Sequence, residues 1–453
     1  MQARSSMPRP RTIHIVSLGC AKNRVDSEFM LGLAVAAGWR PVGSAEQADA
    51  IVVNTCTFIG QARDESIDVI LEMARLKGKG RTRRLIVVGC LPQRYGEDLA
   101  QALPEVDHLI GTADLHRLAE VLAGRAPRVL IGGPGSFLAE ASSERLGSGL
   151  SSYLKIGDGC SKRCAFCIIP GIKGPCRSRT VRSLVEEARR LADHGVVELC
   201  LVAQDLSAFG RDLGERNALE RLIERLREVS GIRWIRLLYF YPDRISPGLL
   251  RLFSEGRPLL PYLDVPIQHA DSRILRRMRR GYGPAFLRRM IETLRSGVPG
   301  ITLRTTVLVG HPGEDDEAFR NLMAFLEWAR FERLGVFRYS AEEGTESFRN
   351  AAPSPRIAYL RYRRVRALGR RIQRRANRSL VGRTVEVLVE GADPSAPYLM
   401  QGRHPGQAPE VDGVVHLADA IGLAPGDRVL AGVEQAGDDD LIARVIRTTD
   451  IGR

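Results

Sequence analysis

Three cysteines on one short stretch are the residues whose type and spacing most directly indicate chemistry. They follow the pattern CxxxCxxC in the run Gly159-Cys160-Ser161-Lys162-Arg163-Cys164-Ala165-Phe166-Cys167. Thiolates are soft, electron-rich ligands that suit iron and zinc. Three of them on one loop can hold three corners of a cubane [4Fe–4S] cluster and leave the fourth iron without a protein ligand. An open position of this kind is what a catalytic metal centre needs.

A structural zinc site is the alternative for this loop. Structural zinc takes four protein ligands at characteristic spacings. The next cysteine, Cys176, lies nine residues after Cys167, and no other Cys or His completes a set nearby. We therefore expect Cys160, Cys164 and Cys167 to be ligands of an iron–sulfur cluster.

Three further cysteines each come directly after a predicted strand. Cys20 follows Thr12–Leu18, Cys56 follows Ala50–Asn54 and Cys90 follows Arg84–Gly89. Amphipathic stretches separate these strands, which predicts a parallel, doubly wound sheet within residues 1–125. The carboxyl ends of parallel strands lie at one edge, beside helix N-termini that stabilise anions. The three cysteines therefore become neighbours, and we interpret them as ligands of a second [4Fe–4S] cluster with an open iron. Three separate buried thiols are the alternative.

Composition changes along the chain indicate three domains. Residues 126–152 are rich in Gly and Ser and are predicted to be a linker. Residues 153–378 resume the β–α alternation with six predicted strands, which favours a full or partial β/α barrel. They end in a basic helix, Arg356–Arg378, with ten arginines and no acidic residue. Residues 379–453 contain short strands and turns typical of a small all-β module.

The overall composition limits the class of protein. Of 453 residues, 44% are apolar and 26% charged, a globular balance that excludes a disordered, collagen-like or coiled-coil chain. The apolar runs are strand-sized, far below the roughly 20 residues of a membrane span, and the basic start predicts no secretory signal. We expect a cytoplasmic protein with no membrane partner, whose eight cysteines stay reduced and serve metal or redox chemistry.

The loop of Cys160, Cys164 and Cys167, placed after the first strand of a β/α barrel, resembles the radical S-adenosylmethionine (SAM) superfamily. The resemblance implies that SAM binds the open iron and that one-electron reduction of the cluster cleaves it to a 5′-deoxyadenosyl radical. A reductase or flavodoxin is the expected electron donor. The radical would abstract hydrogen from an unactivated carbon.

Several residues at the ends of barrel strands are weaker candidates for SAM contacts. Gln204 and Asp205 stand where the superfamily often contacts the SAM amino group, with an ordinary strand-end cap as the alternative. Gly310 and Gly313 lie in a stretch that resembles the family's GxPGE turn, which approaches the adenosine; His311 departs from the apolar residue expected there. His269, Cys176 and Cys200 are expected to be structural. For His269, a role in substrate binding is the alternative.

The combination of a three-cysteine N-terminal domain, a radical SAM barrel and a C-terminal β-module is similar to the methylthiotransferases, whose last module is a TRAM domain. The resemblance implies that Cys20, Cys56 and Cys90 hold the cluster that carries the transferred sulfur, and that a second SAM methylates this sulfur. These cysteines would then be ligands and not nucleophiles. The similarity covers nearly the whole chain.

The substrate class is predicted from charge and from motifs. The chain carries a net charge of +14, but residues 380–453 hold six basic and twelve acidic residues, which would repel tRNA and attract a basic protein. Residues 17–28, 337–345 and 410–417 resemble the branch that modifies the β-carbon of an aspartate in small-subunit ribosomal protein twelve. The alternatives are a tRNA adenosine 2-methylthiotransferase and a non-catalytic Fe–S RNA-binding protein. The Arg356–Arg378 helix is either a solvated face or a contact for ribosomal RNA.

Overall fold

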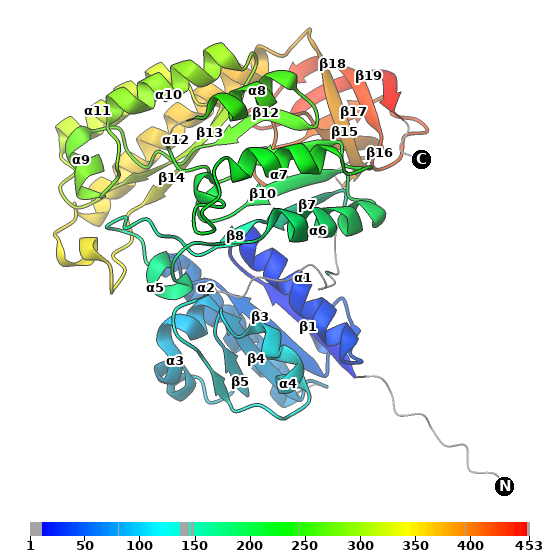
Figure 1. Cartoon of the computed structure of the whole chain (residues 1–453), viewed down its shortest axis with the longest axis vertical. Coiled ribbons are helices and arrows are strands. Elements are labelled where there is room, and N and C mark those ends of the chain that lie inside the picture. Colours follow the sequence, from blue (N-terminus) through cyan, green and yellow to red (C-terminus); the bar gives the residue numbers. More distant parts are fainter. Residues whose placement is uncertain are drawn as a thin grey trace.

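The computed structural model describes residues 11–79, 81–135, 145, 149–243, 245–394 and 396–450. Along the chain it forms an N-terminal α/β domain, a central β/α domain and a small C-terminal β-barrel (Figure 1). Within these residues, no helix is long and apolar enough to cross a membrane. Most of the predicted linker, namely 136–144 and 146–148, lies outside the described residues.

The N-terminal domain is a parallel sheet with helices on both faces, as predicted. Its six strands have the order β2-β1-β3-β4-β5-β6. Alternate residues of β3 face opposite layers: Val52 packs against helices α1 and α4, and Val53 packs against α2 and α3. The elements are β1 (Thr12–Ser17), α1 (Ala21–Ala36), β2 (Arg40–Pro41), β3 (Ala50–Thr55), α2 (Gly60–Lys79), β4 (Arg84–Gly89), α3 (Cys90–Ala102), β5 (His108–Ile110), α4 (Leu118–Leu122) and β6 (Val129–Leu130).

Two boundaries of this domain differ from the sequence prediction. Strand β6 lies within residues 126–152, so the sheet continues into the predicted linker, and Leu130 is buried in the core. Helix α3 begins directly at Cys90, where the sequence predicts the end of a strand followed by an amphipathic stretch, and it has a kink at Gly96, whose φ is 48°. Pro92 is compatible with this start because the first helical turn needs no N–H donor there.

The central domain is an open, partial barrel. Its six parallel strands have the order β7-β10-β11-β12-β13-β14, and the outer strands β7 and β14 do not pair with each other. The elements are β7 (Ser151–Lys155), β8 (Gly157–Asp158), α5 (Ile169–Lys173), β9 (Arg177–Ser178), α6 (Val181–Asp193), β10 (Glu198–Val202), α7 (Ala218–Arg227), β11 (Trp234–Leu237), α8 (Pro247–Glu255), β12 (Leu259–Asp264), α9 (Ser272–Arg277), α10 (Pro284–Gly297), β13 (Thr302–Val309), α11 (Asp316–Ala329), β14 (Arg333–Arg338) and α12 (Pro355–Arg378).

The two faces of this sheet bury different partners. In β10, Leu199 and Leu201 pack outward against the helices, whereas Cys200 and Val202 face the barrel interior. The interior cluster also includes Val25 of helix α1 and two residues of the C-terminal module. Other domains therefore fill part of the barrel interior.

The C-terminal module is a closed barrel with the strand order β15-β16-β17-β19-β18. Its strands are β15 (Thr384–Asp393), β16 (Ala396–Arg403), β17 (Val415–Ala418), β18 (Arg428–Ala436) and β19 (Leu441–Asp450), of which β16 was not predicted. Arg403 forms a buried ion pair with Glu198 at the start of β10, at 2.5 Å. The module therefore packs at the N-terminal end of the central strands.

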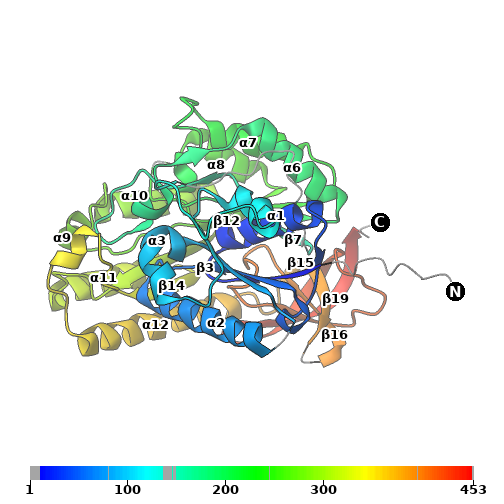
Figure 2. The same cartoon turned by 90° about the horizontal axis from the view of Figure 1, so that it is seen from below.

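The N-terminal domain contacts both edges of the partial barrel. Helix α1 packs along strand β7, and α3 contacts α5 (Figures 1 and 2). On the other edge, in the segment after β14, Ser340 Oγ accepts a hydrogen bond from the Gly60 N–H, at 3.1 Å, and Arg94 pairs with Glu342 at 2.6 Å. This arrangement brings the cysteine-bearing edge of the first sheet toward the open side of the central domain.

Candidate functional site

Cys20, Cys56 and Cys90, called here the dispersed triad, lie at the carboxyl edge of three adjacent strands. Cys20 is the N-cap of α1, Cys56 follows β3, and Cys90 is the first residue of α3. Thr55 of β3 pairs with Gly89 of β4, so Cys56 and Cys90 come next at the same level. The strand order also reverses between β1 and β3, the place where open α/β sheets bind ligands.

The three thiols of the dispersed triad lie close enough to interact electrostatically. A Cβ atom built on Gly19, whose φ is 91°, would lie 2.6 Å from the Cys56 Cβ and 3.1 Å from its Sγ. Burial raises the pKa of Cys90 to about 12; Lys173 lowers this pKa, while Cys56 and Cys20 raise it further. The fold therefore brings together the three cysteines that the sequence predicts as one ligand set.

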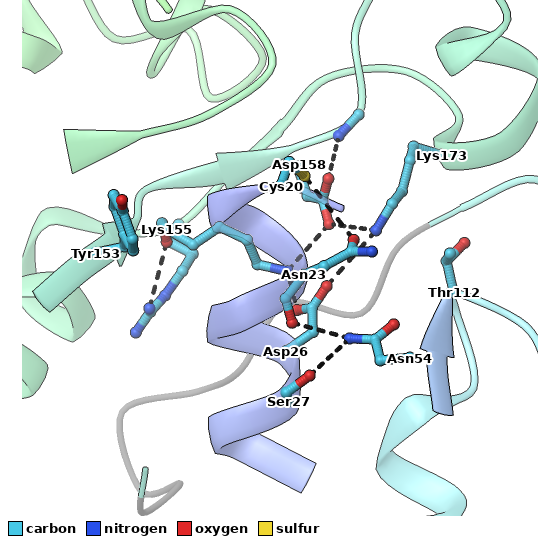
Figure 3. Close-up of polar contacts among 12 residues, drawn as sticks. Cys20, Asn23, Asp26, Ser27, Asn54, Thr112, Tyr153, Lys155, Asp158 and Lys173 are labelled. Carbon is cyan, nitrogen blue, oxygen red and sulfur yellow. Dashed lines mark hydrogen bonds and ion pairs between the residues drawn. The ribbon is translucent and has the colours of Figure 1, made fainter. Parts of the chain in front are cut away.

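Amide and hydroxyl groups hold the segments of the dispersed triad in place. Asn23 donates hydrogen bonds to the carbonyls of Leu18 and Thr55, both at 2.9 Å. Asn54 donates to the Asn23 carbonyl at 2.8 Å and to Ser27 Oγ at 3.0 Å (Figure 3). These bonds satisfy buried backbone acceptors and link β1, β3 and α1, which holds the segments of Cys20 and Cys56 together.

Cys160, Cys164 and Cys167, called here the loop triad, follow β8. A side chain at Gly159, whose φ is 79°, would overlap the Pro175 carbonyl, and the Cys160 N–H donates to the Gly174 carbonyl at 3.0 Å. Burial raises the pKa of Cys160 to about 11 and that of Cys167 to about 12. Arg280 donates to Cys164 Sγ at 3.3 Å and so places a partly buried positive charge beside the loop.

Both triads suit cubane clusters better than a single metal ion. Within the described part of the chain, no three Cys, His, Asp or Glu side chains are arranged to hold one ion. Ligands of a cubane bind separate irons around its corners and need not converge on one point. Cations near each triad, Lys22 and Lys173 on one side and Arg280 on the other, can offset the negative charge of thiolate-bound clusters. The donor sets therefore fit two [4Fe–4S] clusters.

Gln204 and Asp205 offer buried acceptors beside the loop triad. Gln204 donates from Nε2 to Asp158, and Ser207 donates to Asp205 Oδ1 at 2.6 Å. Their other oxygens, Gln204 Oε1 and Asp205 Oδ2, are buried and have no hydrogen-bond partner among the described residues, although Lys162 Nζ lies 3.8 Å from the latter. Unsatisfied buried acceptors suit a ligand with an ammonium or hydroxyl donor, as SAM has.

Gly310 and Gly313, the two glycines predicted to contact SAM, are required by the packing of the protein itself. A side chain at Gly310 would lie 2.7 Å from the Ala358 Cβ of α12, and one at Gly313 would lie 2.6 Å from the Arg277 guanidinium. The space beside each glycine is thus occupied by protein. Their contact with SAM stays a prediction.

The other candidate residues make structural contacts. His311 is buried, forms a hydrogen bond with Ser347 Oγ at 2.9 Å, and packs edge-on to Phe166 of the cysteine loop. Burial lowers the pKa of His311 to about 4, so the ring is neutral at physiological pH. His269 accepts from the Asp271 N–H at 3.0 Å. Cys200 lies in the barrel interior, and the Cys176 N–H donates to Ser161 Oγ at 3.1 Å.

A buried charge network between the two triads was not predicted from the sequence. Asp158 lies between Lys155 and Lys173, with Nζ–Oδ2 distances of 3.0 and 3.2 Å (Figure 3). Both lysines also pair with Asp26 of α1, Lys173 at 3.7 Å. All four side chains are at most 6% exposed. Lys155 stands between the buried residues Leu154 and Ile156, and a charged residue between apolar neighbours is the one sequence signal that could have indicated a buried partner.

Three protein-family models match successive segments of the chain, and these segments correspond to the three domains of the structure. Residues 12–111 match the uncharacterized protein family UPF0004, residues 154–326 the radical SAM superfamily and residues 381–446 the TRAM domain. Two structures of the radical S-adenosylmethionine methyltransferase TsrM from Kitasatospora setae have TM-scores of 0.53 and 0.52, at 13% and 16% identity. They cover 72% and 73% of this chain and 73% and 75% of their own, which shows a shared fold.

Curated relatives match over almost the full length. The chain is 47% identical over 452 residues to the ribosomal protein uS12 methylthiotransferase RimO of Sorangium cellulosum, covering 98% of this chain and 92% of the relative. It is 45% identical to the protein of the same name from Myxococcus xanthus, covering 97% and 93%, and 45% identical to that from Trichlorobacter lovleyi, covering 96% and 98%. The chain belongs to the family of ribosomal protein uS12 methylthiotransferases.

Proposed function

We propose that this chain is a radical SAM methylthiotransferase that methylthiolates the β-carbon of an aspartate in ribosomal protein uS12, with two [4Fe–4S] clusters and two molecules of SAM. The observation that carries the proposal is the presence of two cysteine triads in one interdomain region, each with three thiols. A protein with one radical SAM cluster would need only the loop triad. The relatives that share both triads' domains are named for uS12 methylthiolation.

The two triads would have different chemical roles. The loop triad would hold the cluster that, with SAM bound, would supply the hydrogen-abstracting radical, and the dispersed triad would hold the cluster that would supply the sulfur. Gln204 Oε1 and Asp205 Oδ2 would accept hydrogen bonds from the SAM amino group. Arg280 would hold Cys164 and keep positive charge beside the loop. The network of Asp26 with Lys155 and Lys173 would fix the two triads relative to each other.

The charge argument for a protein substrate is weaker in three dimensions than in the sequence. Asp438 of the C-terminal module pairs with Arg374 of α12, and Asp439 accepts a hydrogen bond from Gln373. Asp440 accepts from the Val414 N–H at 2.8 Å. The acidic run is therefore partly neutralised within the molecule, and the choice of uS12 over tRNA rests mainly on the relatives.

The decisive experiment offers both substrates to one enzyme preparation. The anaerobically reconstituted chain is incubated with SAM and dithionite, together with a uS12 loop peptide and unmodified tRNA. We expect 5′-deoxyadenosine and a methylthio group on the peptide aspartate, identified by tandem mass spectrometry. A methylthio group on tRNA alone would instead identify a tRNA adenosine methylthiotransferase. Intact clusters with no 5′-deoxyadenosine would identify a non-catalytic Fe–S RNA-binding protein.

Two of the partners and the cellular location belong to this proposal. A reductase or flavodoxin would supply the electron in the cell, a contact between α12 and ribosomal RNA would help to position the substrate, and a cytoplasmic location follows from a ribosomal substrate. Replacing dithionite with a flavodoxin system is expected to support peptide modification. Failure of that system with an active dithionite control would exclude this donor.

A further inference from the structure

A pocket of about 640 Å³ lies at the end of the central domain that the cysteines do not occupy. Its wall includes Pro261 and Thr302, near the starts of β12 and β13, and Arg333, the first residue of β14. The last turns of α12 and the C-terminal module close its other sides. The cysteines and the predicted SAM residues lie at the opposite, carboxyl ends of the strands, so this pocket is separate from the site described above.

The wall of the pocket carries an excess of positive charge. Two glutamates line it, and each is engaged: Glu332 pairs with Arg295 at 2.9 Å and Glu386 with Arg257. Four lining arginines have no carboxylate within ion-pair distance among the described residues, namely Arg330, Arg333, Arg375 and Arg383. Helix α12 ends here, but its C-terminal dipole offsets only about half a charge. The positive charge of the pocket wall therefore exceeds the negative charge that nearby carboxylates and the helix dipole provide.

Two hydrogen-bond donors in this wall are unfilled. Arg333 is 4% exposed; its Nε donates to the Gly406 carbonyl at 3.4 Å, and its Nη1 has no partner among the described residues. His404 Nδ1 accepts from the Gly406 N–H at 3.1 Å, so the proton of the neutral ring is on Nε2, which also has no partner. Burial lowers the pKa of His404 to about 3. Buried donors without acceptors are costly, and an oxygen-rich anion would remove that cost.

We propose that this pocket binds a phosphate group, and that the phosphate belongs to the backbone of an RNA. A phosphate offers more acceptor oxygens than a carboxylate and suits several guanidinium groups at once. Arg375 belongs to the last turns of α12, so this helix contributes positive charge directly to the pocket wall. The choice of RNA over a free phosphate rests on the proposed function, since a uS12-modifying enzyme meets ribosomal RNA. The proposal that the pocket binds an anion is independent of the proposed function.

The test measures binding of a fluorescein-labelled single-stranded RNA to the reconstituted full chain by anisotropy at several salt concentrations. Arg375→Gln/Arg383→Gln removes two exposed arginines of the pocket and is expected to weaken binding about tenfold and to reduce the salt slope by about 1.4. Arg333→Gln addresses the buried donor, with circular dichroism to check folding. Arg363→Gln, an exposed α12 arginine outside the pocket wall, is the matched control and is expected to change affinity less than twofold.

Each outcome decides between the proposal and its rivals. Equal weakening by Arg363→Gln would assign RNA binding to the surface of α12 and overturn the pocket. Binding of inorganic pyrophosphate that depends on Arg375 and Arg383, without any effect on RNA, would overturn the RNA assignment. The pocket variants should still form 5′-deoxyadenosine at the unsubstituted rate, because the pocket is remote from the triads. If the unsubstituted chain binds RNA through the pocket yet never modifies uS12, the proposed function fails and this inference stands.

Discussion

The two cysteine triads place the same ligands by opposite means. The loop triad lies within eight consecutive residues, and one turn held by Gly159 and Gly174 shapes it. The dispersed triad joins residues seventy positions apart, and only the parallel order of β1, β3 and β4 brings its members together. A local site requires little loop closure before the ligands meet, whereas the dispersed site depends on a folded sheet. The dispersed triad should therefore respond to distant changes in the fold, and the loop triad mainly to local ones.

The largest expected effect separates the roles of the triads. Replacing Cys160, Cys164 and Cys167 by Ala should abolish 5′-deoxyadenosine formation and leave about four irons per chain of the eight expected. Replacing Cys20, Cys56 and Cys90 should also leave about four irons, but SAM cleavage should continue while methylthio transfer stops. Iron analysis with SAM-cleavage and peptide assays distinguishes the variants. Loss of SAM cleavage in both would contradict two independent clusters.

The glycine that precedes the first cysteine of each triad gives a matched pair of single substitutions. Gly19 and Gly159 both have positive φ, and a side chain at either would collide with protein atoms. Gly19→Ala is expected to displace Cys56 and to lose the dispersed cluster, and Gly159→Ala to lose the loop cluster. Gly38→Ala is the control, because Gly38 also has positive φ, at 83°, but has no atom within 4 Å of an added Cβ. Its cost should be backbone strain of about 1 kcal/mol, with both clusters kept.

The sequence predicted each triad for a different reason, and the same reasons explain what it missed. Spacing alone indicates the loop triad, and strand-end position with parallel topology indicates Cys20, Cys56 and Cys90. Short or interrupted elements were not predicted from the sequence. Strand β6 has only two residues, and the kink at Gly96 interrupts the helical pattern after the start of α3 at Cys90. The pairing of Asp26 with Lys155 joins two domains, and no local pattern specifies which buried charges meet across such an interface.

The buried network gives a third way to distinguish the triads. Asp26→Asn would remove one of the two carboxylates that pair with both Lys155 and Lys173, and loss of one partner from a buried pair costs about 3–5 kcal/mol. Because α1 carries both Asp26 and the Cys20 N-cap, iron at the dispersed triad should be lost at lower urea concentrations than iron at the loop triad. Glu120→Ala, which removes an exposed pair with Arg117 in the same domain, should leave both midpoints unchanged. Simultaneous loss of both clusters in Asp26→Asn would mean that the network supports the two triads equally.

The smallest expected effect is a pH dependence near the dispersed triad. Asp264, at the end of β12, is fully buried, and burial raises its pKa to about 6, although Arg304 and Lys22 lower it and Asp412 raises it. Because the folded state binds this proton more tightly than the unfolded state, the contribution of Asp264 to the unfolding free energy should fall as pH rises from about 4 to about 6, by up to about 3 kcal/mol. Asp264→Asn keeps the acceptor for the Tyr239 N–H and should remove this slope, so the variant is more stable than the parent at pH 7 in urea titrations.

Glu198→Gln is the opposite control: Arg403 and Arg236 hold the pKa of Glu198 at about 2 despite burial, so its charge stabilises the fold at neutral pH and its removal should lower stability there. A stability difference between the parent and Asp264→Asn that stays constant between pH 4 and 6 would show that Asp264 is ionised throughout, with Arg304 as its main partner.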